Sequence, residues 1–183
     1  MAESFDLRQN HFELFSLPVA FEIDGAAMTA RYRDLQKRFH PDNFASGTPQ
    51  EKRYSAQISA LVNEAYKTLG DDLQRASYLL SLQGIDLASE TDTRVAPEFL
   101  MAQMELRETL EAIPAAADPF AEADVLDARI AEQRQAIKAR VAEQLSAQNF
   151  DAARESVREW QFFHKLASEL DGIVHALEET QDS

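Results

Sequence analysis

The sequence predicts an all-α protein with an N-terminal helical hairpin and a C-terminal three-helix bundle. Apolar side chains recur every three or four residues through most of the 183 residues, which is the spacing of one face of an α-helix. We find no alternating apolar and polar run typical of a β-strand. The chain holds only 5 Gly and 6 Pro, and they fall mostly where one periodic segment gives way to the next. This pattern is typical of long helices joined by short connections.

The first helix of the predicted hairpin starts at Asp24, a suitable N-cap, and carries one apolar stripe. The stripe comprises Met28, Tyr32, Leu35 and Phe39. The helix must end near Phe39, because Pro41 disfavours the helical conformation at the preceding residue, His40. A short leading helix is also expected over residues 11–15.

The second helix of the hairpin opens with Thr48-Pro49-Gln50-Glu51, the pattern of a capping box with proline at the first helical position. We expect this helix to end at Gly70, and a further helix to run from Asp71 or Asp72 to about Gln83. Its apolar stripe comprises Tyr54, Ile58, Leu61, Val62, Ala65 and Leu69. Two amphipathic helices joined by a short loop should pack as an antiparallel hairpin.

Three more helices are predicted after a polar connector at residues 85–96, which divides the chain into domains at 1–84 and 97–183. The first opens at Ala96-Pro97-Glu98 and ends before Pro114, the second starts at Asp118-Pro119, and Asn149 marks the turn to the third. The expected core positions of the last two helices are Leu126, Ile130, Gln133, Ile137, Val141, Leu145, Val157, Trp160, Phe163, Ala167, Leu170 and Val174. The proline-marked breaks favour a compact bundle over the alternative of a long coiled coil.

The composition argues against several kinds of activity. A net charge of -14 does not suit general nucleic-acid binding, which needs a basic surface. Cysteine is absent, so the chain has no thiolate ligands for zinc or an iron–sulfur cluster, and we expect no metal site or cofactor. It has no Gly-rich phosphate loop. We also expect no membrane span and a cytoplasmic protein, because the N-terminus lacks a basic start followed by an apolar run.

The predicted hairpin ends in His40-Pro41-Asp42, and this tip is the first candidate site. A proline-containing turn presents two polar side chains at a low ordering cost. Four cations precede it in an otherwise acidic protein, which indicates a contact site for an acidic partner. They are Arg31, Arg33, Lys37 and Arg38. The alternative is an ordinary polar turn beside a solvated helix face.

We do not expect the tip to be catalytic. Positions around a proline do not orient the Asp42 carboxylate onto the His40 imidazole as a catalytic base requires, and no nucleophile motif accompanies them.

The helix that starts at Pro97 predicts a second site, because it has two apolar sides. One side holds Phe99, Ala102, Leu106, Leu110 and Ile113, and the other holds Leu100, Met101 and Met104 with Glu108 and Glu111. A bundle helix should bury only one stripe, so a second stripe rich in methionine indicates an adaptable protein-binding patch. On the last helix, Phe162 is expected to point roughly opposite to the core face. Alternatively, Leu100 and Phe162 pack beneath the other domain or the linker.

Several segments resemble known families. Tyr32 to Asp42 resembles the second helix and signature loop of a J-domain, and Asn63 to Leu69 resembles the helix that follows. Phe44 to Gly47, Arg75 to Leu82 and Phe99 to Glu108 are similar to the HscB family, the J-type co-chaperones of iron–sulfur cluster assembly. The similarity runs from about residue 12 to 177 and is strongest over 32–110.

The resemblance implies two protein partners and no enzymatic activity. The tip would engage the DnaK-type chaperone HscA and stimulate its ATPase, and the four cations would steer the hairpin to an acidic chaperone surface. The scaffold IscU, as the client, would bind Leu100, Met101, Met104, Glu105, Glu108 and Phe162. A further acidic position of that surface is Ala112 here, beside Glu111. The alternatives are a J-protein with a different client and a helical metalloenzyme that uses scattered histidines and carboxylates.

Overall fold

The computed structural model describes residue 6 and residues 8–87 and 97–181. Contacts divide the chain into two compact units, Met1–Leu82 and Gln83–Ser183. All regular elements of the described residues are helices, as the sequence predicted. Most of the expected linker at 85–96 lies outside the described residues, so its boundaries stay a prediction. No described helix is long and apolar enough to cross a membrane.

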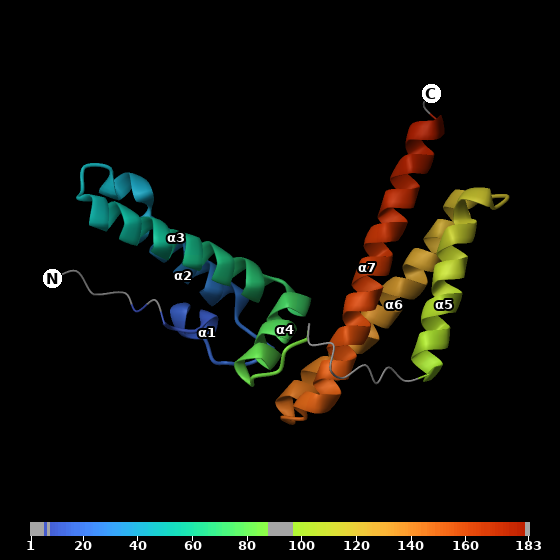
Figure 1. Ribbon diagram of the computed structural model, residues 1–183, viewed down its shortest axis with the longest axis horizontal. Coiled ribbons are helices and arrows are strands. Elements are labelled where there is room, and N and C mark those ends of the chain that lie inside the picture. Colours follow the sequence, from blue (N-terminus) through green and yellow to red (C-terminus); the bar gives the residue numbers. More distant parts are fainter. Residues whose placement is uncertain (1–5, 7, 88–96, 182–183) are drawn as a thin grey trace. The chain divides into compact units, whose positions relative to one another are not determined.

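The first unit contains α1 (His11–Leu14), α2 (Gly25–Phe39), the 3-10 turn η1 (Pro41–Phe44), α3 (Pro49–Gly70) and α4 (Asp72–Leu82). The helices α2 and α3 form the predicted hairpin, and the loop that joins them lies at the end of α3 opposite α4 (Figure 1). The expected caps are present. The Asp24 side chain accepts a hydrogen bond from the Ala27 N–H, and Thr48 and Glu51 form both bonds of a capping box.

The core of this unit matches most of the predicted apolar stripes, with Met28, Leu35, Ile58 and Leu69 buried. Tyr32 is only half-buried. Its ring stacks on Tyr66 with the centroids 4.1 Å apart, and its hydroxyl donates to the Asn63 side chain at 3.0 Å. Tyr32 therefore ties α2 to α3 at the edge of the core.

Arg75 of α4 makes a buried connection that the sequence did not predict. Its guanidinium donates to the carbonyl oxygens of Phe21 at 2.7 Å and Leu69 at 2.5 Å, and pairs with the Asp72 carboxylate. These bonds join α4 to the end of α3 and to the segment before α2. The hairpin is thus braced at the end opposite its connecting loop.

The second unit contains α5 (Pro97–Ala112), the 3-10 turn η2 (Ile113–Ala115), α6 (Pro119–Ser146) and α7 (Phe150–Gln181). The long helices α6 and α7 run antiparallel, and α5 packs beside them (Figure 1). Asp118 caps α6 as expected, and the predicted turn lies between Ser146 and Phe150. Its left-handed residue is Gln148, at φ 56, rather than Asn149, the residue that marked it in the sequence.

The core of the second unit comprises Leu106, Leu110, Ile113, Ala123, Leu126, Ile130, Ile137, Val141, Ala153, Val157, Trp160, Phe163, Leu166 and Leu170. The prediction placed Ala167 in this core, whereas the structure buries Leu166 and leaves Ala167 half-buried. Gln133, Leu145 and Val174 are also half-buried. The side of α7 that is buried in the bundle is therefore slightly different from the side that the periodicity indicated.

Candidate functional site

His40, Pro41 and Asp42, here called the corner, link α2 to η1. His40 has an extended conformation, with φ -59 and ψ 131, which is the conformation that a following proline favours. All three residues are exposed. The corner lies at the free end of the hairpin, away from the packed α4 end (Figure 1).

The imidazole and the carboxylate of the corner lie close together. His40 Nδ1 is 3.3 Å from the Asp42 amide nitrogen and 3.5 Å from Asp42 Oδ2, because η1 turns Asp42 back over the ring. The Asp42 side chain is 89% exposed, however, so the arrangement does not resemble a buried catalytic base.

Two side chains that the sequence analysis missed support the corner. Asn43 donates its side-chain amide to the Lys37 carbonyl at 2.8 Å, and Ser55 of α3 donates its hydroxyl to the Phe39 carbonyl at 2.9 Å. A signal for them exists in the sequence. Pro41 has no N–H, so the end of α2 needs donors from elsewhere.

Arg31 differs from the other three predicted cations in its surroundings. Arg31 is half-buried and pairs with Asp34 at 3.3 Å, so part of its charge is neutralised. Arg33, Lys37 and Arg38 are exposed, and the Arg38 guanidinium lies over the Phe39 ring at 5.3 Å from its centroid. The exposed positive charge of α2 is therefore concentrated near the corner.

Leu100, Met101 and Met104, here called the apolar patch, lie on the outer side of α5. Their exposed fractions are 52%, 65% and 58%, whereas Leu106 and Leu110 on the other side are buried. The structure thus confirms the two-sided character of α5. The carboxylates of Glu105, Glu108 and Glu111 are exposed, and so is Ala112.

Phe162 does not point away from the bundle, and that expectation is wrong. Its ring meets the edge of Phe99 on α5 at a centroid distance of 5.7 Å and Phe163 at 5.4 Å. Arg107 of α5 lies over the same ring at 5.9 Å and pairs with Glu169 at 3.7 Å. Leu100, Met104 and Arg107 share one face of α5, so half-buried Phe162 borders the face that carries the apolar patch.

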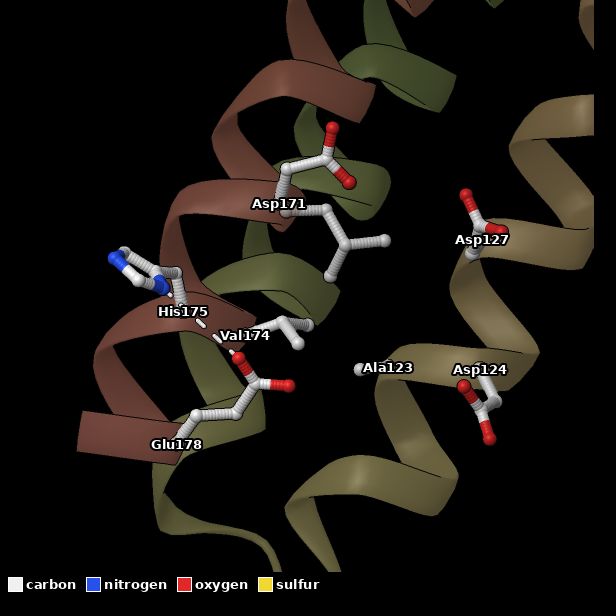
Figure 2. Close-up of a pocket in the computed structure, with 8 residues that line it drawn as sticks. Ala123, Asp124, Asp127, Asp171, Val174, His175 and Glu178 are labelled. Carbon is white, nitrogen blue, oxygen red and sulfur yellow. Dashed lines mark ion pairs between the residues drawn. The ribbon is translucent and has the colours of Figure 1, made fainter. Parts of the chain in front are cut away.

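A groove of about 250 Å³ lies elsewhere in the second unit, between α6 and α7 (Figure 2). Its lining is Ala123, Asp124, Asp127, Leu170, Asp171, Val174, His175 and Glu178. His175 pairs with Glu178 at 3.9 Å and with Glu179 at 3.5 Å. Among the described residues, no three histidine or carboxylate side chains are placed to hold a metal ion.

Known proteins match this chain along most of its length. Residues 95–171 match the family model described as the HSCB C-terminal oligomerisation domain. The co-chaperone protein HscB homolog of Vibrio cholerae is 44% identical over 168 residues, which cover 92% of this chain and 98% of that protein. A homologue from Aliivibrio fischeri is 41% identical over the same length.

Solved structures agree with the sequence relatives. The chaperone HscB from Vibrio cholerae superposes with a TM-score of 0.86 at 43% identity, covering 92% of this chain and 99% of that one. Human co-chaperone HscB superposes with a TM-score of 0.84 at 30% identity, covering 91% and 83%. With 92% of this chain covered, the matches span both units. The chain therefore belongs to the HscB family of J-type co-chaperones.

Proposed function

We propose that the protein binds two partners through two separate surfaces. The corner contacts a DnaK-type chaperone of the HscA kind and stimulates its ATPase. The apolar patch, with Glu105, Glu108 and Phe162, binds an iron–sulfur scaffold of the IscU kind and delivers it to that chaperone. The protein thereby promotes cluster transfer to iron–sulfur proteins and has no catalytic activity of its own.

The observation that carries this proposal is the placement of the corner. Its polar side chains are exposed at the free end of a hairpin that Arg75 and the Tyr32–Asn63 contact hold rigid. A preorganised contact point loses little conformational entropy on binding. The exposed cations of α2 raise the rate of encounter with an acidic surface, while the corner itself supplies the specific contact.

The apolar patch supports the proposal that the protein binds a scaffold as its second partner. Three large apolar side chains, each more than half exposed, lie together on one helix face beside exposed carboxylates. Methionine adapts its shape to a partner, and a contiguous exposed apolar surface of this kind typically marks a protein interface. The half-buried ring of Phe162 offers a rigid aromatic anchor at the border.

His40→Gln tests the chaperone contact in a steady-state ATPase assay with HscA-type and general DnaK-type chaperones, with and without scaffold. We expect the variant to lose stimulation, because glutamine cannot reproduce the imidazole of the corner. Scaffold binding should be unchanged. The control is His164→Gln, an exposed histidine of α7 outside both surfaces. Stimulation by the His40→Gln variant at the wild-type level would exclude this role for the corner.

Combined alanine replacement of Leu100, Met104 and Phe162 tests the scaffold contact. Calorimetry should show binding weakened by about 2–4 kcal/mol, the range of a small hot-spot cluster. ATPase stimulation without scaffold should persist. Because Phe162 also packs against Phe99, the exposed Met104→Ala alone is measured as well. The control is Val125→Ala, which removes an equally exposed apolar side chain from α6. Unchanged affinity in the triple variant removes these residues from the interface.

A further inference from the structure

The proline of the corner leaves the end of α2 short of hydrogen-bond donors. In a continuing helix the Lys37 carbonyl would accept from residue 41, but Pro41 has no N–H. The next two backbone N–H groups both donate to His40. The Asp42 N–H donates to His40 Nδ1 at 3.3 Å, and the Asn43 N–H donates to the His40 carbonyl at 3.0 Å. The carbonyls of Lys37 and Phe39 therefore need other partners.

Side chains supply both partners. The Asn43 amide donates to the Lys37 carbonyl at 2.8 Å, so it takes the place of the hydrogen that proline lacks. The Ser55 hydroxyl donates to the Phe39 carbonyl at 2.9 Å, and Ser55 is completely buried between the helices. The Asn43 bond connects the residue after the corner to the last turn of α2. The Ser55 bond connects the end of α2 to α3.

We propose that Asn43 and Ser55 are positioning residues, which hold the corner in the orientation that the chaperone recognises. This inference rests on the proposed function. Neither residue needs to touch the chaperone. Each instead raises the fraction of molecules whose corner is ready to bind, and the apparent affinity for a partner scales with that fraction.

The first test compares Asn43→Ala, Asn43→Gln and Ser55→Ala in the ATPase assay, as titrations of the full-length protein. We expect each alanine variant to need more protein for half-maximal stimulation, by up to about fivefold. One ordinary hydrogen bond changes the ratio of ready to unready molecules by that factor, and the apparent affinity follows the ready fraction. Maximal stimulation should be unchanged, unlike in His40→Gln. Asn43→Gln keeps the amide donor in an exposed position and should recover most of the loss.

Matched controls are available on the same elements. Ser46 is exposed in the loop after the corner and Ser59 is half-buried one turn beyond Ser55. Within the described residues neither side chain makes a hydrogen bond, so Ser46→Ala and Ser59→Ala should titrate like the wild type. Circular dichroism at the assay temperature shows whether each variant is folded. If Ser55→Ala does not fold, the two Asn43 variants still decide the inference.

A second measurement does not depend on the chaperone. The Ala45 N–H bonds to the Asp42 carbonyl at 3.2 Å and the Gly47 N–H to the Phe44 carbonyl at 2.9 Å. Their amide exchange, followed by NMR, should accelerate several-fold in Asn43→Ala and Ser55→Ala but not in the controls. Wild-type half-saturation and wild-type exchange in both alanine variants would overturn the inference while His40→Gln still upholds the proposed function. A wild-type protein that stimulates no chaperone would overturn that function, and the inference with it.

Discussion

His11 is a single residue that makes stability depend on pH. Its ring stacks on Tyr78 with the centroids 4.2 Å apart, and its buried Nδ1 has no hydrogen-bond partner among the described residues. Burial lowers the pKa of His11 below its usual 6.5, although the nearby Glu64 carboxylate acts in the opposite direction. The unfolded chain therefore binds this proton more readily than the folded chain. The contribution of His11 to the free energy of unfolding is therefore most favourable above pH 6.5 and falls as the pH drops through the range between the two pKa values.

His11→Phe should reduce this dependence, because phenylalanine can stack on Tyr78 without titrating. We expect urea unfolding of the wild type to show a loss of stability from pH 7.5 to 5 that is smaller in the variant. The exposed His164→Gln serves as the control and should follow the wild type. Parallel curves for wild type and His11→Phe would mean that His11 does not contribute.

The residues that the sequence analysis missed share one kind of hydrogen bond. Asn43, Ser55 and Arg75 each donate to backbone carbonyls, and the Phe21 carbonyl that Arg75 reaches is 54 residues away in sequence. Such bonds leave no periodic pattern in the sequence, because the acceptor is a backbone carbonyl and every residue has one. Only the missing N–H of Pro41 could have predicted that a donor was needed.

At the scale of elements, the start of α3 depends on one titrating side chain. The Glu51 carboxylate accepts from the Thr48 backbone N–H at 2.8 Å and from its hydroxyl at 2.9 Å. These bonds from Thr48 lower the pKa of Glu51 below its usual 4.5. The capping box is therefore complete above pH 4.5 and is lost as the pH falls through the lowered pKa.

Glu51→Gln should keep the capping box while removing its titration, because glutamine also serves at this position. NMR of the wild type in acid should show the Thr48 amide losing protection below pH 4.5, whereas the Gln variant should keep it. Glu64→Gln, an exposed position later in α3, is the matched control. A Thr48 amide that behaves alike in wild type and Glu51→Gln would contradict the role of this carboxylate.

The limits of the helices could be predicted because capping is local. Asp24, Thr48 and Asp118 each bond to an amide three residues later, so a few residues specify each start. The position of Phe162 could not be predicted in the same way. Its surroundings depend on which flank of α7 meets Phe99 of α5, and that is decided by tertiary packing rather than by helical period.

At the scale of the whole molecule, charge is distributed unevenly. The chain has a net charge of -14, yet α2 exposes Arg33, Lys37 and Arg38 beside the corner. Residues 97–183, which carry the apolar patch, hold 8 basic and 18 acidic residues, a net charge of -10. The sequence was sufficient to predict this polarity, because formal charges need no tertiary information. Only the structure showed that Arg31 is partly neutralised by Asp34.

Charge reversal near the corner should slow association with the chaperone more than it speeds dissociation. For Arg33→Glu combined with Lys37→Glu, we expect an association rate about tenfold lower at low ionic strength, because steering depends on the field around the corner. The deficit should shrink near 0.15 M salt, where the Debye length is only about 8 Å. Stopped-flow mixing measures both rates. Arg129→Glu combined with Lys165→Glu makes the same change in net charge on the second unit and should have a much smaller effect. Equal slowing by both pairs would show that net charge, rather than the exposed cations of α2, controls the encounter.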